Sequence, residues 1–267
     1  MPNRWIEANG IQLRYELQAG PPATIVLLHE MGGMLESWDA VVPLLTPFAS
    51  VLRYDQRGAG LSEKPPGPYA VAQAADDLAA LLAALAITGP VAVVGAAVGA
   101  AVAAAFAARH PRAIAALALL APATVLDETK RARTEQRIAA IERLGIRQAF
   151  ADEPAKPRSR YEELRLAADP VGLAATWRML AGLDLDTDLA TIRCPTLVVA
   201  GRQDAARPPK HVAGVAAKIA GAEFLILDTG HVMAIDTPEL TASTLRDFLV
   251  RAYFQAAQPA DGQALDH

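Results

Sequence analysis

The chain has 267 residues, 52% of them hydrophobic, a formal net charge of −4 and a single cysteine, Cys194. This composition favours one globular domain with an insertion, and it argues against a nucleic-acid partner, a membrane span and an internal disulfide. Because the first residues also lack the apolar core of a signal peptide, we expect a cytoplasmic protein.

Short apolar runs typical of β-strands alternate with helical patterns along most of the chain. Residues 11–17 alternate apolar with polar residues, as an edge or antiparallel strand does. Continuous apolar runs, typical of strands covered on both faces, lie at residues 23–29, 51–55, 91–94, 114–120, 196–200 and 224–227. Helical periodicity occurs between runs, at residues 70–85 and 100–109. This alternation predicts the α/β class, with a mostly parallel sheet wound on both faces.

The alternation stops between about residues 122 and 187. This stretch is charged, mostly helical in pattern and without a buried-strand run, which predicts a helical lid inserted before the strand at residues 196–200. We therefore expect a discontinuous core at residues 1–121 and 188–257, a lid at residues 122–187 and a polar tail at residues 258–267.

Residues 95–99 read Gly-Ala-Ala-Val-Gly, directly between a strand pattern and a helix pattern. A nucleophile elbow has the form GxSxG, because small residues must flank a sharp turn that raises one side chain above the sheet. The central serine is replaced by Ala97. A dinucleotide-binding turn would need GxGxxG and an acidic residue that closes the next strand, and the chain has neither.

Three more loops with reactive side chains follow predicted strands. The first reads His-Glu-Met-Gly-Gly at residues 29–33, the second ends in Asp204 and the third ends in His231. Binding sites of open α/β sheets lie at the carboxyl ends of the strands. The order of elbow, acid and histidine along the chain is that of an α/β-hydrolase catalytic triad.

On these motifs, the chain resembles the α/β-hydrolase superfamily over nearly its whole length. Residues 54–62, Tyr-Asp-Gln-Arg-Gly-Ala-Gly-Leu-Ser, also match a structural turn of that fold. Within the superfamily the chain is similar to 3-oxoadipate enol-lactonases and related hydrolases of small rings or carbon–carbon bonds. That likeness depends on an arginine-bearing lid and on the runs at residues 168–173 and 183–185.

The resemblance implies a role for each matching residue. His231 would be the general base, and Asp204 would hold its other ring nitrogen, with Asp127 as the alternative acid. The backbone amides of Met31 and Val98 would form the oxyanion hole. Family members usually have glycine at the position of Glu30, so this residue is a departure from the pattern.

The lid suggests the class of substrate. Between the elbow and Asp204 lie Arg131, Arg133, Arg137, Arg143, Arg147, Arg158, Arg160, Arg165 and Arg178. Most should be solvated, but one or two that point inward would pair with the carboxylate of a small lactone or ester. We expect Glu30, Trp177 and Arg160 to contact this substrate.

Three functional hypotheses follow from the alanine at the elbow. The chain is a serine hydrolase with Ala97 in place of its nucleophile, a change that traps intact substrate, or it is an enzyme that never used serine. In the second case His231 would take a proton or activate water, as in lyases or cofactor-free oxygenases of the superfamily. The third hypothesis is a non-catalytic ligand receptor. All three hypotheses involve a small-molecule partner, and we expect a monomer or homodimer. No motif calls for a metal or an organic cofactor.

Overall fold

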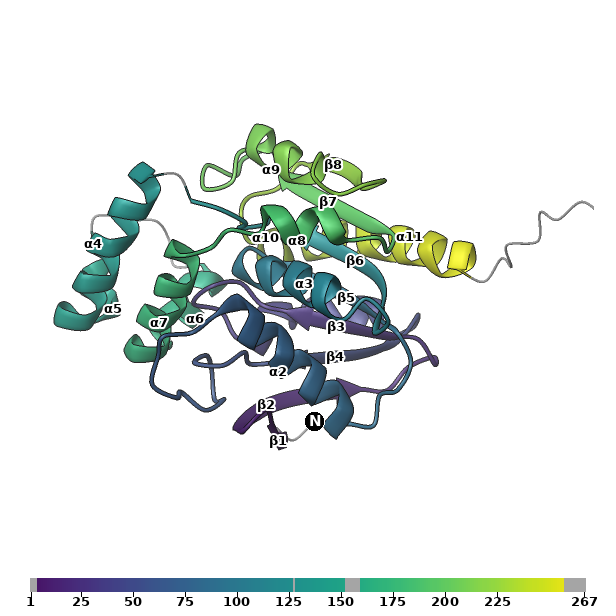
Figure 1. The fold of residues 1–267 in the computed structure, drawn as a ribbon, viewed down its shortest axis with the longest axis horizontal. Coiled ribbons are helices and arrows are strands. Elements are labelled where there is room, and N and C mark those ends of the chain that lie inside the picture. The colour runs from purple at the N-terminus through teal and green to yellow at the C-terminus, as the bar shows by residue number, and fades with distance from the viewer. Residues whose placement is uncertain (1–3, 127, 152–158, 257–267) are drawn as a thin grey trace, which may run out of the picture.

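An eight-stranded sheet with helices on both faces forms the centre of the molecule (Figure 1). The structure, a computed structural model, describes residues 4–126, 128–151 and 159–256. The strands are β1 (Arg4–Ala8), β2 (Ile11–Gln18), β3 (Thr24–Leu28), β4 (Ser50–Tyr54), β5 (Val91–Ala96), β6 (Ile114–Leu120), β7 (Thr196–Gly201) and β8 (Glu223–Leu227). Their order across the sheet is β1-β2-β4-β3-β5-β6-β7-β8. Only the β1–β2 and β2–β4 pairs are antiparallel, which confirms the predicted α/β class.

The seven predicted strands are present as β2 to β8, whereas β1 was not predicted. This strand lies at the edge of the sheet and pairs only with β2. Most of its residues are exposed or partly exposed, including Trp5. Because an edge strand buries little apolar surface, its sequence carries only a weak hydrophobic pattern.

Two groups of helices cover the sheet. The first face carries α2 (Val71–Ala84), α3 (Val98–Arg109), α8 (Asp186–Thr191) and α9 (Pro209–Ala216). The second face carries α1 (Val42–Leu45), α10 (Met233–Asp236) and α11 (Pro238–Ala256). The short helix η1 (Leu35–Trp38) comes directly before α1 along the chain. Every residue of α3 from Val98 to Ala107 is buried, and its many alanines allow the helix to lie close to the sheet. No described helix is long and apolar enough to cross a bilayer.

Four lid helices stand beside one end of the sheet (Figure 1). They are α4 (Glu128–Leu144), α5 (Ile146–Ala149), α6 (Arg160–Leu166) and α7 (Pro170–Ala181). Their small apolar core, separate from the two main ones, contains Ile138, Ile141 and Leu173. All four helices fall inside the segment predicted to be a lid, and the predicted tail at residues 258–267 lies outside the described residues.

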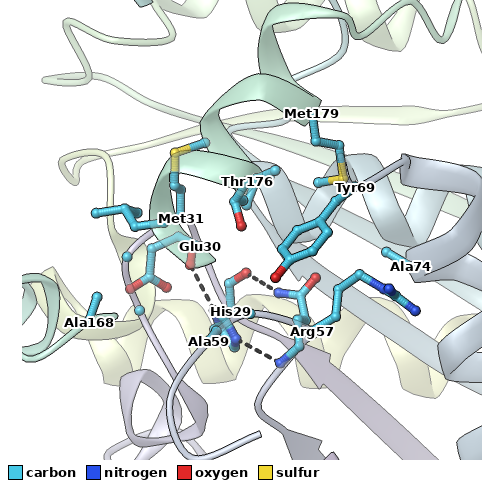
Figure 2. A pocket seen from close by; sticks show the side chains of 16 residues that line it. His29, Glu30, Met31, Arg57, Ala59, Tyr69, Ala74, Ala168, Thr176 and Met179 are labelled. Carbon is cyan, nitrogen blue, oxygen red and sulfur yellow. Dashed lines mark hydrogen bonds between the residues drawn. The ribbon is translucent and has the colours of Figure 1, made fainter. Parts of the chain in front are cut away.

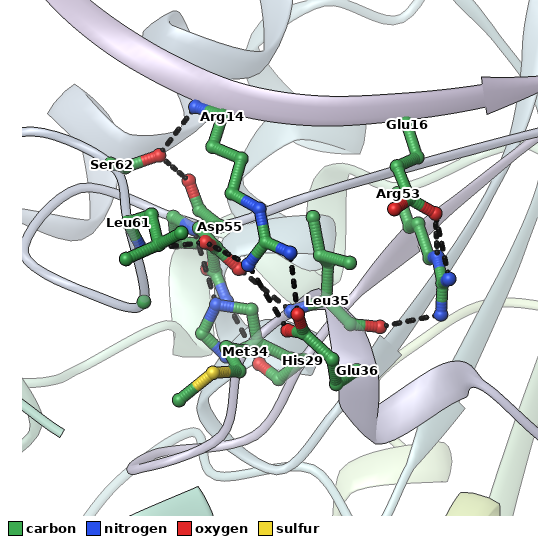
Figure 3. Close-up of polar contacts among 12 residues, drawn as sticks. Arg14, Glu16, His29, Met34, Leu35, Glu36, Arg53, Asp55, Leu61 and Ser62 are labelled. Carbon is green, nitrogen blue, oxygen red and sulfur yellow. Dashed lines mark hydrogen bonds and ion pairs between the residues drawn. The ribbon is translucent and has the colours of Figure 1, made fainter. Parts of the chain in front are cut away.

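Buried polar contacts fix the loop after β4 (Figure 3). The carboxylate of Asp55 accepts hydrogen bonds from the backbone N–H groups of Leu35 and Leu61, each at 2.7 Å, and from the Arg14 guanidinium at 3.1 Å. Ser62 Oγ donates to the Asp55 carbonyl at 2.6 Å and accepts from the Arg14 N–H at 2.8 Å. These contacts hold the loop against η1, next to the residues that follow β3.

Candidate active site

Ala97 occupies a sharp turn between β5 and α3. Its backbone angles are φ 50° and ψ −106°, a conformation that L residues rarely adopt outside such turns. The Ala97 N–H donates to the Leu120 carbonyl at 2.9 Å, and its carbonyl accepts from the Ala123 N–H at 3.1 Å. The strained geometry is therefore held by the end of β6.

The glycines on either side of Ala97 are needed because other backbone segments lie very close. A Cβ on Gly95 would lie 2.3 Å from the Gly99 carbonyl oxygen, and one on Gly99 would lie 2.5 Å from the His29 carbonyl oxygen. This close approach brings the start of α3 against the loop after β3. The sequence pattern of small residues around position 97 thus has a direct steric cause.

The Gly99→Ala substitution should destabilise the fold by about 1 to 3 kcal/mol, because the added methyl group has no space next to His29. Gly214→Ala is the matched control, since a Cβ at that position in α9 meets nothing within 4 Å. The control should raise the free energy of unfolding by about 0.5 to 1 kcal/mol. Urea unfolding monitored by circular dichroism measures both values. Equal effects of the two substitutions would contradict the steric argument.

Asp204 and His231, on the loops after β7 and β8, form a hydrogen-bonded pair. His231 Nδ1 lies 2.7 Å from Asp204 Oδ2. Asp204 Oδ1 accepts from the N–H groups of Ala206 and Arg207, both at 2.8 Å. Burial opposes ionisation of Asp204, but the hydrogen bond and charge of His231 and the two backbone N–H groups outweigh it and lower the pKa of the carboxyl. An ionised Asp204 holds the imidazole proton on Nδ1, which leaves Nε2 as the basic nitrogen.

A cavity of about 520 Å³ brings the predicted site residues together. Ala97, Val98, Met31 and His231 all line it, with Asp204 directly behind His231. Val98 is the first residue of α3, so its N–H lies among the donors at the positive end of the helix dipole. This arrangement can stabilise negative charge beside the Ala97 methyl group.

The lid contributes cationic and aromatic side chains to the same cavity. Trp177 lines it as predicted, whereas Arg160 lies outside, half-exposed and paired with Glu163 and Asp39. The cavity is lined instead by five other basic residues, namely Lys130, Arg133, Arg137, Arg165 and Arg207. Lys130 and Arg207 were not among the predicted candidates. Asp127, the alternative acid, lies outside the described residues.

Tyr161 links the lid to the predicted oxyanion loop. Its hydroxyl group, on α6, donates to the Met31 carbonyl at 3.0 Å. A Cβ on Gly32 would lie 3.1 Å from Arg165 Cγ, so α6 also packs closely against the next residue of the loop. The position of the Met31 amide is therefore coupled to the position of the lid.

Glu30 is buried in the loop after β3, with 1% of its surface exposed. It lines a second, smaller cavity of about 30 Å³, shown in Figure 2, and does not line the large one. Its Oε1 accepts from Ser37 Oγ at 2.8 Å, and a Cβ on Gly33 would lie 2.2 Å from the same oxygen. Burial raises the pKa of Glu30, and the charge of His29 and the Ser37 hydrogen bond oppose that shift only in part.

The raised pKa of Glu30 predicts a pH-dependent cost to stability. In the folded state the neutral form persists to higher pH than in the unfolded chain, so the free energy of unfolding should fall as pH rises through that interval. The slope for one proton is at most about 1.4 kcal/mol per pH unit. Glu30→Gln removes the titratable group and keeps the shape of the side chain. The free energy of unfolding of this variant should therefore fall less between about pH 5 and pH 9 than that of the unmodified chain. Urea unfolding at each pH gives the free energy of unfolding of both proteins. An equal change of this free energy with pH in the two proteins would exclude the effect.

Comparisons with known proteins identify the family and the fold. The profile of the family described as alpha/beta hydrolase fold matches residues 23–179. A pyrrolizixenacetamide deacetylase from Xenorhabdus hominickii is 27% identical over 262 residues, which cover 92% of this chain and 97% of that protein. The crystal structure of the enol-lactonase from Burkholderia xenovorans is similar with a TM-score of 0.85 and 28% identity, covering 92% of this chain and 100% of that one. The structure of a malate-bound thermophilic esterase from Thermogutta terrifontis is similar with a TM-score of 0.83 and 26% identity. The match covers 94% of this chain and 99% of that one.

Proposed function

Since the chain belongs to the α/β-hydrolase fold family, we propose that its site is that of a serine-type hydrolase with alanine at the nucleophile position. The reaction of the serine form is acyl transfer to water. Its substrate is a small, carboxylate-bearing ester, lactone or compound with a cleavable carbon–carbon bond. The observation that carries the proposal is the 2.7 Å hydrogen bond between Asp204 and His231 beside a cavity that Ala97 also lines.

Each residue has a defined role when position 97 carries a hydroxyl group. His231 Nε2 takes the hydroxyl proton as the oxygen attacks the substrate carbonyl, and Asp204 stabilises the resulting imidazolium. The amides of Met31 and Val98 donate to the tetrahedral oxyanion. His231 then protonates the leaving group, and a water molecule releases the acid by the same steps. The proposal requires no metal or organic cofactor.

The cationic side chains in the cavity support a carboxylate-bearing substrate. Arginine pairs with carboxylates through two parallel hydrogen bonds, and Trp177 adds an apolar wall. The related Thermogutta protein was solved with malate, a carboxylate, and the Burkholderia relative is an enol-lactonase. We place the activity in the cytoplasm, in a monomer or homodimer.

A second function is favoured by Ala97 itself. The elbow places a methyl group where the family's nucleophile stands, while His231 lines the cavity with about a third of its side chain exposed. His231 would then remove a proton from substrate or from water without a covalent intermediate. A site of this kind needs no hydroxyl at position 97.

The test is a substrate screen of the Ala97→Ser variant against small esters and lactones, both carboxylate-bearing and neutral. Strong gain of hydrolysis supports the serine-type proposal. Absence of gain, with an activity of the unmodified chain that His231→Ala abolishes, supports the second function. If neither protein turns over any substrate, the cavity is that of a ligand receptor.

A further inference from the structure

Glu30 directly precedes Met31, whose backbone amide is one of the two proposed oxyanion donors. We infer that Glu30 is a positioning residue for this amide, and that it holds the loop after β3 in place only as a neutral carboxylic acid. Ionisation of Glu30 then moves the loop and displaces the Met31 amide. The inference rests on the proposed function for the role of that amide, whereas the state of the carboxyl group follows from its surroundings.

The backbone of Glu30 closes the turn that carries Met31. Its carbonyl accepts a hydrogen bond from the Gly33 N–H at 3.1 Å and lies 2.7 Å from His29 Nδ1. His29 Nε2 accepts from the Gln56 N–H at 3.1 Å, so the ring proton belongs on Nδ1, which donates to the Glu30 carbonyl. The turn at residues 30–33 is thus fixed to the loop after β4.

The side chain of Glu30 folds back against the same turn. A Cβ on Gly33 would lie 2.2 Å from Glu30 Oε1, and this oxygen accepts from Ser37 Oγ on η1 at 2.8 Å. The carboxyl group therefore fills the space between the turn and η1 and joins the two. A change in the carboxyl group acts directly on the segment that presents the Met31 amide.

The second carboxyl oxygen of Glu30 is closed off from water. Among the residues that the structure describes, none forms a hydrogen bond with Oε2, which is buried. The small cavity, lined by all four residues of the turn, has a volume of about 30 Å³, enough for a water molecule (Figure 2). Because Oε2 is not accessible, water can solvate a charge on this oxygen only after the turn has moved.

The basic groups near Glu30 are bound to other residues. Arg57 lines the same small cavity, but its Nε and a terminal nitrogen bind the buried carboxylate of Asp77 at 2.5 and 2.6 Å. His231, on the loop after β8, is paired with Asp204. The His29 ring becomes positively charged only if its bond from the Gln56 N–H breaks. The one hydrogen bond to the Glu30 carboxyl group from a described residue is therefore that of Ser37.

The remaining titratable groups around the loop also have partners of their own. The Tyr69 hydroxyl group, in the small cavity, donates to the Pro65 carbonyl at 2.8 Å. Glu36, on η1, forms an ion pair with Arg14. Arg165, on α6, stacks on the ring of Phe150. Contacts with these groups do not stabilise a charge on Glu30.

These surroundings favour the neutral acid over the carboxylate. Burial raises the pKa of Glu30, and the charges of His29 and His231 and the Ser37 hydrogen bond oppose this shift only in part. The contribution of the neutral acid to the closed loop is therefore complete at low pH and is lost as pH rises through the raised pKa. Above it, the closed loop competes with an open form in which water solvates the carboxylate.

Amide hydrogen exchange of the unmodified chain between about pH 5 and pH 9 measures this opening. Mass spectrometry follows the peptide that covers residues 29–37, and each rate is divided by the intrinsic rate at that pH. We expect protection to fall by up to about tenfold per pH unit once Glu30 ionises. Residues 91–96 of β5 report global unfolding and should lose less protection. Constant protection of residues 29–37 across the range would overturn the inference.

Three variants assign the effect to the Glu30 carboxyl group. Glu30→Gln should keep the loop protected at every pH, whereas Glu7→Gln, at an exposed glutamate of β1, should leave the fall unchanged. Ser37→Ala is a second variant in case Glu30→Gln does not fold. It should move the fall to higher pH, because the Ser37 hydrogen bond favours the carboxylate. Equal pH dependence in a folded Glu30→Gln, or a fall at lower pH in Ser37→Ala, would contradict the inference.

The pH profile of the Ala97→Ser variant separates the inference from the proposed function. Its kcat should fall at alkaline pH, by up to about tenfold per pH unit, and Glu30→Gln should remove this fall. Loop protection that falls with pH in a variant without hydrolysis would keep the role of Glu30 in the loop and reject the serine-type reaction. Hydrolysis with the same pH profile in both proteins would keep the hydrolase and reject the positioning role.

Discussion

The Ala97→Ser variant should hydrolyse a small ester or lactone about a million-fold faster than the unmodified chain. The reason is that Ala97, with its strained backbone, lines the same cavity as His231, the partner of Asp204, and as Val98 at the N-terminus of α3. The proposed serine-type reaction then lacks only the nucleophilic oxygen. Initial rates with chromogenic esters, measured at several enzyme concentrations, determine the gain.

Ala205→Ser is the matched control for this gain. Ala205 lines the same cavity and is exposed, so a hydroxyl group there should be tolerated, but it does not lie on the elbow. We expect no gain of activity from this substitution. A gain of similar size at both positions would show that the elbow geometry has no special role. No gain at position 97 in a folded protein would reject serine-type catalysis.

In the Ala97→Ser background, Asp204→Asn should lower kcat by about 10⁴-fold. Asparagine cannot carry the negative charge that stabilises the imidazolium, and its N–H₂ group favours the wrong tautomer of His231. Asp228→Asn is the control, because Asp228 is an exposed carboxylate on the loop after β8 that contacts Arg202 and Gln203. Its kcat should stay unchanged. A loss below about tenfold for Asp204→Asn would assign the triad acid to another residue.

The lowered pKa of Asp204 also gives the sign of an acid effect on stability. In the folded state the carboxyl stays ionised at pH values where it is protonated in the unfolded chain, so its contribution is present at neutral pH. That contribution is lost as pH falls through the ordinary aspartate pKa and then through the lowered one. Asp204→Asn should therefore lower stability at neutral pH and reduce its loss in acid, which urea unfolding at several pH values measures.

The central part of the fold could be predicted from the sequence because its strands are buried on both faces. Continuous apolar runs predict such strands directly, and β3, β5 and β7 appear within one or two residues of the expected positions. The family resemblance, carried by the loops after these strands and after β8, is confirmed by the profile match over residues 23–179. The sequence pattern did not predict the edge strand β1, because its side chains are mostly exposed.

The orientation of the lid side chains could not be predicted in the same way. Arg160 and Arg165 are on one helix, yet only Arg165 lines the cavity, where it packs on Phe150. The face of α6 that turns inward depends on contacts between this helix and the loop at Met31. These contacts cannot be predicted from the pattern of a single sequence. The spacing of Lys130, Arg133 and Arg137 was the available signal for an inward-facing row on α4.

Covalent labelling of the Ala97→Ser variant by a small fluorophosphonate tests most directly whether the imidazole, the carboxylate and the two amides converge on position 97. Intact-mass and peptide mass spectrometry would follow the reaction, with the unmodified chain and an Ala97→Ser/His231→Ala double variant alongside. We expect one adduct, at position 97, that forms rapidly in the single variant, at least about 10³-fold more slowly in the double variant, and not at all in the unmodified chain. A folded single variant that stays unlabelled at position 97, or labelling that is equally fast without the histidine, would contradict the account.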